Sequence, residues 1–468
     1  MIELYSHQQS LLDSCRASMR RGNKSVLIQA ATGFGKTILS AKMIHDSRTK
    51  GTRSMMVVPR RELLSQTSET FNEYEMPFGY VAAGKPHNPY ARTKLATTGT
   101  LSSWIRRTPD KAPDVDVLIV DETHYGGDGL DDIIQFYKKR GSYLVGLSAT
   151  PWKLDGRGLG MWYDDMVCGP SIRWLMDNKF LSDYRLFAPN KPDLSKIKTV
   201  AGDYAKGQLA DYMEHDRVLV GNAVQHYRDH AMGRLNIAYT TSRKHSEIVA
   251  QSFRDAGIPA MDIDGETPEE ERRKIIRAFA RRELLVLVNC ELLTFGFDLA
   301  SAAGIDVTVE SMSDLRPTKS LSLQMQKWGR VLRRKDYPAL IFDHAGNVSY
   351  HGFPDDDRKW SLVGEERGTR GSASERITQV KVCDRCAFAH APSPSCPSCG
   401  FVYPVRSREI DEVDGTLTEM SRAEVPQPEK IQAAMDAMIF NAVKKGMPKW
   451  KAQQWAAKQI TKQLARRQ

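Results

Sequence analysis

Short apolar runs alternate with amphipathic segments along the first 350 residues. Four runs in the first half predict buried strands, at residues 25–30, 54–59, 115–121 and 143–150. Four more follow at residues 235–240, 284–290, 305–310 and 339–343. Apolar strands that alternate with helical segments are typical of parallel sheets covered by helices on both faces. The pattern therefore predicts two α/β domains of similar build, residues 1–185 and 186–350.

The pattern changes after residue 350. Residues 351–380 are polar and Gly-rich, which favours a linker. Four cysteines follow within residues 381–404, and residues 405–429 are acidic and irregular, which indicates a second linker. Residues 430–468 contain no acidic residue after Asp436, and they predict a basic tail of two short helices broken at residues 446–448.

Composition fits a folded motor or binding protein with a polyanionic partner. The chain has 468 residues, 41% of them hydrophobic, which is too long for one ordinary core. Its net charge of +10 favours nucleic acid or a membrane surface, and charge alone does not separate them. The first ten residues are polar, and no run of about 18 apolar residues occurs. We therefore expect a cytoplasmic protein.

A candidate phosphate-binding loop follows the first predicted strand, in the sequence QAATGFGKTILS. Such a loop needs glycines to turn backbone N–H groups inward, a lysine for the phosphates and a hydroxyl for Mg²⁺. Gly33, Gly35, Lys36 and Thr37 supply these groups, although Ala30 stands where the general pattern has glycine. A plain Gly-rich turn between strand and helix is the alternative.

Two acids follow the strand predicted at 115–121. That strand would deliver Asp121 and Glu122 to the carboxyl edge of the sheet, where ligands bind in open α/β folds. One carboxylate can hold Mg²⁺ while the other orients or deprotonates an attacking water. Two solvated acids are the alternative, which the phosphate loop makes less attractive.

These segments resemble the motifs of superfamily 2 helicases. Ala30 to Thr37, the DETH sequence from Asp121 and the SATPW sequence from Ser148 resemble motifs I, II and III, and motif I of that family commonly has a non-glycine at its first position. Further resemblances, all in the family's order, are residues 57–66 (motif Ia), 97–101 (Ib), 238–247 (IV), 292–300 (V) and 324–334 (VI). Residues 315–334, 339–354 and 360–365, with the cysteines that follow, are similar to the RadD-like DNA-repair helicases of bacteria and phages.

The resemblance implies two tandem RecA-like parallel-sheet domains, ATP and Mg²⁺ as cofactors, and roles for individual residues. ATP would be bound by Gln8, Thr32, Gly33, Gly35, Lys36, Thr37, Gly296 and Asp298, with Thr37 and Asp121 on the metal. The family usually has an arginine and an aromatic residue where Tyr5 and His7 stand. Catalysis would use Lys36, Asp121, Glu122, Gln326, Arg330 and Arg333. Coupling would involve His124, Ser148 and Thr150, and nucleic acid would be contacted by Arg60, Arg61, Thr97, Thr98 and Thr241.

The motif VI stretch QMQKWGRVLRR carries four positive charges and no negative one. It could be a solvated basic face or a nucleic-acid patch. The phosphate loop and its acids favour a third interpretation, in which Arg330 and Arg333 meet a phosphate across a cleft between the domains. An arginine supplied in this way is worth about 10³ to 10⁵ in rate. We expect Lys327 and Arg334 to be solvated and Trp328 to pack.

The four clustered cysteines predict a structural zinc ribbon. Cys383 and Cys386 form one C-x-x-C pair, and Cys396 and Cys399 form a second after nine intervening residues. Four thiolates at this spacing close a tetrahedron around Zn²⁺. His390 could replace one ligand, but we expect it to be an ordinary loop histidine. The module would bind nucleic acid or a partner protein.

These observations predict an ATP-dependent DNA helicase or translocase that acts in repair, recombination or phage genome processing, in a bacterial or phage-infected cell. An RNA-remodelling ATPase would share every motif. The motor subunit of a restriction system is a third candidate, although the chain has no recognisable nuclease motif. A zinc-bearing binding protein with an inactive motor is disfavoured by the intact acids and arginines. A protein partner could bind through the zinc ribbon or the basic tail, and a membrane surface ranks last.

Overall fold

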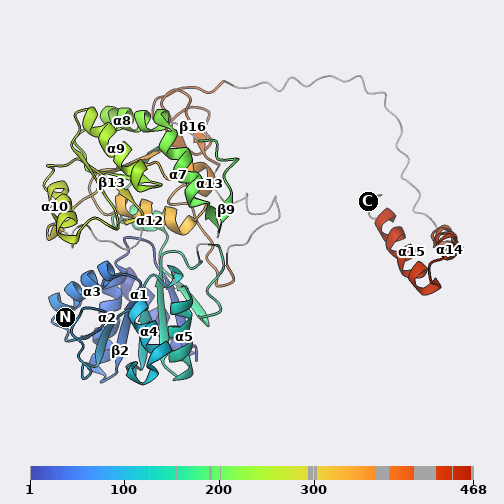
Figure 1. Ribbon diagram of the computed structural model, residues 1–468, viewed down its shortest axis with the longest axis horizontal. Coiled ribbons are helices and arrows are strands. Elements are labelled where there is room, and N and C mark those ends of the chain that lie inside the picture. Colours follow the sequence, from blue (N-terminus) through green and yellow to red (C-terminus); the bar gives the residue numbers. More distant parts are fainter. Residues whose placement is uncertain are drawn as a thin grey trace. The chain divides into compact units, whose positions relative to one another are not determined.

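The computed structural model describes residues 2–125, 127–153, 155–188, 192–200, 202–292, 299, 303–364, 379–404, 428–444 and 446–464. The chain forms two compact units, Met1–Tyr403 and Pro404–Gln468 (Figure 1). The described part contains no helix that is long and apolar enough to span a membrane.

The first sheet has seven parallel strands in the order β3-β4-β2-β5-β6-β1-β7. Its strands are β1 (Ser25–Gln29), β2 (Ser54–Val58), β3 (Gly79–Val81), β4 (Thr93–Thr97), β5 (Val117–Val120), β6 (Tyr143–Ser148) and β7 (Asp165–Cys168). Its helices are α1 (Ser6–Arg20), α2 (Lys36–Thr49), α3 (Arg61–Glu73), α4 (Thr98–Arg107), α5 (Asp128–Lys139) and α6 (Ile172–Asp177). Every residue of β1, β2 and β4 is buried, which explains why these strands lack alternation in the sequence.

The second sheet has six parallel strands in the order β12-β13-β11-β14-β15-β8. Its strands are β8 (Tyr184–Phe187), β11 (Asn236–Thr240), β12 (Ala260–Ile263), β13 (Val286–Cys290), β14 (Ser311–Asp314) and β15 (Ala339–Asp343). Its helices are α7 (Lys206–His215), α8 (Arg217–Ala231), α9 (Arg243–Asp255), α10 (Glu269–Ala280), α12 (Leu321–Val331) and α13 (Asn347–His351), and a short hairpin joins β9 (Thr199–Val200) to β10 (Asp203–Tyr204). Both predicted parallel-sheet domains are therefore confirmed.

One predicted strand is wrong. The apolar alternation at residues 305–310 predicts a strand, but the strand of the sheet is β14, which begins at Ser311. It is buried throughout although it is largely polar, because it lies between β11 and β15. The Asn236 side chain satisfies it, accepting a hydrogen bond from Ser311 Oγ (3.0 Å) and donating one to Ser313 Oγ (3.2 Å). A polar strand of this kind gives no hydrophobic signal.

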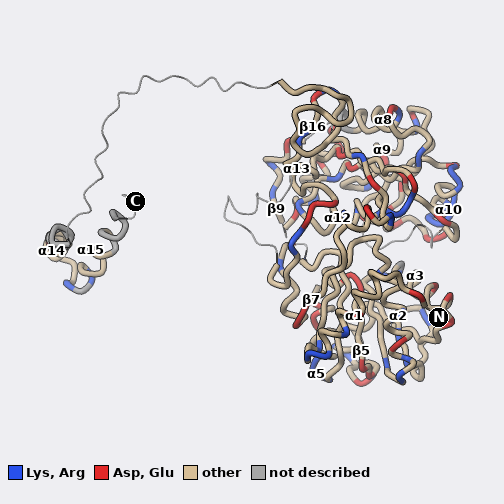
Figure 2. The backbone as a smooth tube through the Cα atoms, turned by 180° about the vertical axis from the view of Figure 1, so that it is seen from behind, with Lys and Arg blue, Asp and Glu red and all other residues tan. Residues whose placement is uncertain are grey.

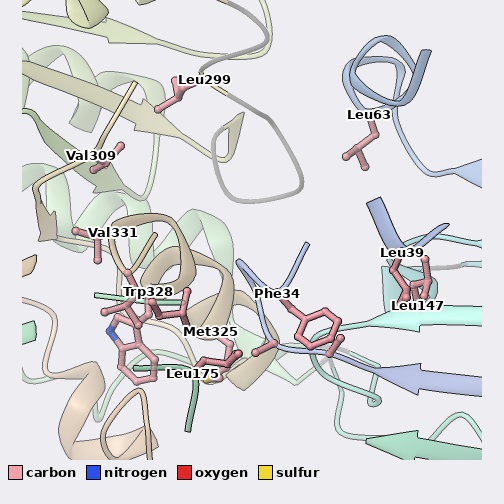
Figure 3. Packing of buried hydrophobic residues seen from close by; sticks show 14 of the residues in the cluster. Phe34, Leu39, Leu63, Leu147, Leu175, Leu299, Val309, Met325, Trp328 and Val331 are labelled. Atoms are coloured by element: carbon pink, nitrogen blue, oxygen red, sulfur yellow. The ribbon is translucent and has the colours of Figure 1, made fainter. Parts of the chain in front are cut away.

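Helix α12 packs against the first domain as well as its own. Figure 3 shows Met325 and Trp328 of α12 beside Leu175 of α6 and near Phe34 of the loop before α2, and all four belong to one buried cluster. Trp328 is 1% exposed, so the prediction that it packs is confirmed. The helix that carries motif VI is therefore held against both domains.

The predicted linker 351–380 departs from that expectation in its described part. Residues 352–364, here called the return segment, lead from α13 back to the first domain, where Leu362 packs against the buried cluster of that sheet. Gly160 N–H donates a hydrogen bond to the Leu362 carbonyl (2.9 Å). Leu362 and Trp360, whose ring contacts the Trp152 ring, explain this packing.

The cysteine module lies against the edge of the second sheet. Its strands β16 (Lys381–Val382) and β17 (Ala389–His390) pair with each other, and Ala188 N–H, just after β8, donates to the Ala387 carbonyl (3.0 Å). The second unit contains α14 (Pro428–Lys444) and α15 (Lys449–Leu464), on either side of the predicted break. The predicted acidic linker lies mostly outside the described residues.

Candidate active site

The phosphate loop has the conformation that its glycines permit. Gly33 and Gly35 have φ of 86° and 92°, in the left-handed region that favours glycine, and Gly35 caps the start of α2. A Cβ atom on Gly35 would lie 2.7 Å from Gln8 Nε2, and one on Gly33 would lie 2.8 Å from Leu181 Cδ2. The loop delivers Lys36 and Thr37 at the N-terminus of α2, where free backbone N–H groups attract anions.

Gln8 is bonded to the phosphate loop. Its Nε2 donates to the Phe34 carbonyl (2.8 Å), and its Oε1 accepts from Tyr5 N–H (3.0 Å). The side chain is 5% exposed. Gln8 therefore fixes the loop against α1 in this structure.

Two aromatic residues that the sequence prediction missed surround His7, next to Gln8. The His7 ring lies 4.2 Å from the Phe180 ring and 5.5 Å from the Trp174 ring, centroid to centroid. Both partners come from the segment that crosses between the domains, whose sequence carries no motif. Only the fold brings them to the phosphate loop.

The two acids lie beside Lys36. Lys36 Nζ is 3.8 Å from Glu122 Oε1, and Asp121 Oδ1 accepts from Glu122 N–H (2.9 Å). Burial raises the pKa of Asp121 to about 7, and the charge of Glu122 adds to the shift. Glu122 has φ of 45°, a strained conformation for a residue with a side chain, and strain of this kind gathers at functional sites. Its Oε2 has no hydrogen-bond partner among the described residues.

A chain of polar contacts runs from Glu122 into the second domain. His124 Nδ1 lies 3.4 Å from Glu122 Oε2 and 2.9 Å from Ser148 Oγ, while His124 Nε2 lies 3.2 Å from Gln326 Nε2. Burial lowers the pKa of His124, so the ring is neutral. An amide nitrogen can only donate, so Nε2 accepts from Gln326 and the proton sits on Nδ1. Motif III makes a second crossing, because Thr150 Oγ1 donates to Ser322 Oγ (2.7 Å).

Helix α12 brings Gly329 against the phosphate loop. A Cβ atom on Gly329 would lie 2.2 Å from Thr32 Cβ, so the helix backbone touches the phosphate loop. Arg330 is buried, and the charges of Arg330 and Arg333 act on Tyr239 of β11, whose pKa is raised chiefly by burial. Arg333 also pairs with Leu181 through a backbone bridge. Arg330 therefore lies in the last turn of α12 and Arg333 two residues beyond the helix, and both lie close enough to Tyr239 for their charges to act on its hydroxyl.

The prediction that Lys327 is solvated is wrong. The side chain is fully buried, and its Nζ lies 2.7 and 2.8 Å from the two carboxylate oxygens of Asp314 and 3.0 Å from the Arg316 carbonyl. One turn of helix separates it from Arg330, and the sequence alone could not tell that this face of α12 is turned to β14. Arg334 is exposed, as predicted.

The residues predicted to contact nucleic acid lie where β2, β4 and β11 end. Arg60 Nη2 donates to the Tyr125 hydroxyl (3.0 Å), and its guanidinium lies 5.3 Å from the centre of that ring. Arg61 is exposed, whereas Thr97 is buried and donates to Thr100 Oγ1 (3.1 Å). Thr98 donates to the Val58 carbonyl (3.3 Å), and Thr241 Oγ1 lies 3.0 Å from His245 Nδ1. Gly296 and Asp298 lie outside the described residues.

Comparison with known proteins agrees with this geometry. Residues 1–153 match the family model of the type III restriction enzyme res subunit, and residues 220–335 match the helicase conserved C-terminal domain. The 51.5 kDa protein of a Lactococcus phage (isolate 7-9) is 30% identical over 411 residues, which span 87% of this chain and 83% of the phage protein. The chain belongs to the superfamily 2 helicases. It is an ATP-hydrolysing enzyme of that family.

Other relatives are larger than this helicase. The putative ATP-dependent helicase IRC3 of Saccharomyces cerevisiae is 26% identical over 358 residues, and the match spans 72% of this chain and 51% of the yeast protein. A fragment of a putative HsdR subunit from Vibrio vulnificus YJ016, of a type I restriction enzyme, has a TM-score of 0.56 at 17% identity and covers 75% of this chain and 65% of its own. The type ISP restriction-modification enzyme LlaBIII has a TM-score of 0.55 at 16% identity over 73% of this chain and 27% of its own. At 16–17% identity these two likenesses show that the fold is shared and nothing more.

The helicase also carries the predicted four-cysteine cluster. The sulfur atoms of Cys383, Cys386, Cys396 and Cys399 all lie within 4.8 Å of one another, which is compatible with a tetrahedral zinc site. The His390 ring is engaged elsewhere, with Nε2 2.6 Å from the Tyr403 hydroxyl and Nδ1 2.6 Å from the Ala391 carbonyl. His390 is therefore not a ligand in this arrangement.

Proposed function

We propose that this helicase couples ATP hydrolysis to movement on DNA, in repair, recombination or phage genome processing. The observation that carries the proposal is the polar path from Glu122 through His124 to Gln326, because it links the acid beside the phosphate loop to the other domain. Opening of the cleft must break that path. The state of the nucleotide and the spacing of the domains would then control each other.

The residues around the cleft fit ATP and Mg²⁺. The N–H groups of the phosphate loop and Lys36 would hold the phosphates, and Thr37 and Asp121 would hold Mg²⁺, which neutralises charge on the phosphates. Glu122, whose Oε2 has no hydrogen-bond partner in the part of the chain that the structure describes, would orient the attacking water and accept its proton. Arg330 and Arg333 would stabilise the charge that develops on the γ-phosphoryl group. For Gly296 and Asp298 a role at the nucleotide stays a prediction from the sequence.

Adenine would be bound beside Gln8. The family usually has an arginine and an aromatic residue where Tyr5 and His7 stand. Here the rings of Phe180 and Trp174 lie beside His7, and Trp174 is 38% exposed. Stacking on this surface would supply affinity for a base. Because Gln8 is already bonded to the loop, base binding and loop conformation would depend on the same side chain.

DNA is favoured over RNA as the track. The res-subunit family model covers the first domain, and the structural neighbours LlaBIII (TM-score 0.55) and the DUF1998 helicase MrfA (TM-score 0.50) were both solved bound to DNA. Lys and Arg are interspersed with Asp and Glu along both domains (Figure 2), so the grip would rest on particular phosphate contacts. We place Arg60, Arg61, Thr97, Thr98 and Thr241 among these contacts.

The deciding experiment compares ATP turnover with single-stranded DNA, duplex DNA, forked DNA and RNA at fixed salt. We expect stimulation by at least one DNA and a decline as salt rises, because phosphate contacts release counterions. Stimulation by RNA alone would overturn the choice of DNA and support an RNA-remodelling ATPase. A restriction-type role requires a nuclease partner, which co-purification with its host proteins would reveal.

We propose further that the four-cysteine module holds one structural Zn²⁺ and that it and the basic tail offer surfaces to nucleic acid or a protein partner. The sulfur geometry supports zinc, and binding of zinc supplies on the order of 10 kcal/mol to modules of this kind. Elemental analysis should find about one zinc per chain, and Cys396→Ser should lose it. The likeness to RadD-like repair helicases and a cytoplasmic site in a phage-infected bacterium belong to the same proposal.

A further inference from the structure

The return segment gives the two domains a second connection. The chain crosses once between β7 and β8, and it crosses back after α13 through residues 352–364. The two crossings are bonded to each other, because Arg173 of α6 forms an ion pair with Asp355, which also accepts a hydrogen bond from the Tyr184 hydroxyl. The domains are therefore joined by a pair of linked segments.

The first half of the return segment is fixed to the second domain. The Arg358 guanidinium donates to the carbonyls of His351 (3.1 Å) and Phe353 (2.7 Å). It also donates to the carbonyls of Pro354 (3.2 Å) and Asp356 (3.0 Å), and these bonds fold the segment into a tight turn after α13. His351 Nε2 in turn contacts the Thr318 carbonyl (2.9 Å), in the loop that leads into α12. Movement of α12 must therefore carry this turn with it.

The second half is fixed to the first domain at Trp152, the last residue of motif III. Trp152 Nε1 donates to the Ser361 carbonyl (2.9 Å), and its ring meets the Trp360 ring edge to face at 4.9 Å. The fit leaves no space, because a Cβ atom on Gly158 would lie 2.0 Å from the Leu362 carbonyl oxygen. This contact is built for close backbone approach.

Motif III is consequently held at two points, one on α12 of the second domain and one on the return segment. Thr150 bonds to Ser322 of α12, and Trp152, two residues later, bonds to the return segment. A cavity of about 220 Å³ lies beside motif III, lined in part by Ala149, Met325 and Trp360. Ser148, at the start of the same motif, contacts His124 beside Glu122. A shift of the return segment can therefore reach the acid that acts on water.

We propose that Trp360 is a positioning residue for ATP hydrolysis, which acts through Trp152 and motif III to set the His124 and Glu122 side chains when the domains close. The proposal rests on the ATPase activity and does not depend on whether DNA or RNA is the track. Its physical basis is that displacement of a catalytic group by about 1 Å can cost up to a hundredfold in rate. The phosphate loop lies outside this path, so affinity for ATP should be little affected.

The test is steady-state ATP hydrolysis by full-length Trp360→Ala, with the nucleic acid that best stimulates the wild type. We expect kcat to fall about tenfold or more while KM for ATP changes less than twofold, and Trp360→Phe to restore most of the rate because it keeps an aromatic edge against Trp152. Val363→Ser is the matched control, since Val363 lies in the same segment and is 93% exposed. It should behave as the wild type.

Two further readouts separate positioning from folding. Melting curves should show Trp360→Phe as stable as the wild type, and binding of a non-hydrolysable ATP analogue with nucleic acid should change tryptophan fluorescence less in that variant. Wild-type kcat in Trp360→Ala would overturn the proposal. So would a loss of kcat that merely tracks the fraction of unfolded enzyme, or an equal loss in Val363→Ser. Loss of stimulation in the wild type itself would instead count against the proposed motor function.

Discussion

Two lysine–carboxylate pairs occupy comparable places in the two domains and are built in opposite ways. Lys36 and Glu122 lie near the carboxyl edge of the first sheet with 3.8 Å between Nζ and Oε1, and both side chains keep some exposure, at 11% and 12%. Lys327 and Asp314 lie at the same edge of the second sheet with 2.7 Å between Nζ and Oδ1, and both are fully buried. Asp314 also accepts hydrogen bonds from Gln324 and Asn347.

The difference shows how a parallel-sheet edge is used for chemistry in one domain and for cohesion in the other. The first pair leaves Glu122 Oε2 without a hydrogen bond among the described residues, and Asp121 beside it has a raised pKa. Such a site is ready to take a cation and a water. The second pair has satisfied its charges internally, and breaking a buried pair leaves an uncompensated charge.

The largest effect should come from removing Arg330, which we propose acts on the nucleotide held beside the first pair. Arg330→Ala should lower kcat for ATP by about 10³ to 10⁵, because the γ-phosphoryl charge loses its partner from the other domain. Arg334→Ala is the control, since Arg334 is exposed and should leave turnover unchanged. If Arg330→Ala kept its turnover and lost only DNA affinity, motif VI would be a basic patch after all.

The next effect concerns the acid of the first pair. Glu122→Gln should lower kcat by about 10² to 10⁴, the range for loss of a general base, while circular dichroism and melting show a folded protein. Lys36→Ala should lower kcat by a similar factor, because the phosphates lose the lysine of the loop. Unchanged hydrolysis in either variant would contradict the assignment of the active site.

The second pair should respond in stability. Lys327→Met should lower the free energy of unfolding by about 3 to 5 kcal/mol, because Asp314 is left buried and unpaired. Lys36→Met is the matched control, and its urea midpoint should stay close to that of the wild type although its activity is lost. Equal destabilisation by the two variants would erase the contrast between the pairs.

The smallest effect is a dependence on pH in the second domain. His344, next to β15, is fully buried, and burial lowers its pKa to about 3. In the unfolded chain this histidine binds a proton near pH 6.5, whereas in the folded chain it stays neutral down to about pH 3. The free energy of unfolding therefore falls as the pH drops from 6.5 towards 3, by up to about 1.4 kcal/mol per pH unit. His344→Phe should show a shallower fall between pH 7 and pH 5 in urea unfolding, and identical slopes would refute this.

The sequence predicted those parts of the fold whose structure depends on residues close together in the chain. The strands before Ala30, Pro59 and Asp121 were predictable because buried parallel strands are continuous apolar runs. The phosphate loop was predictable because glycine spacing dictates backbone shape. The polar strand β14 and the buried Lys327 were not, because their partners lie far away in the sequence. The same holds for Phe180, Trp174 and the return segment, whose places depend on how the chain crosses between domains.

Gly329 carries a consequence for how this helicase could change over time. Glycine in the middle of a helix costs about 1 kcal/mol relative to alanine, so Gly329→Ala would strengthen α12 in isolation. In the assembled cleft the added methyl group would collide with Thr32. Selection for a more heat-resistant helix would therefore favour alanine at this position, and selection for a closed cleft would favour glycine.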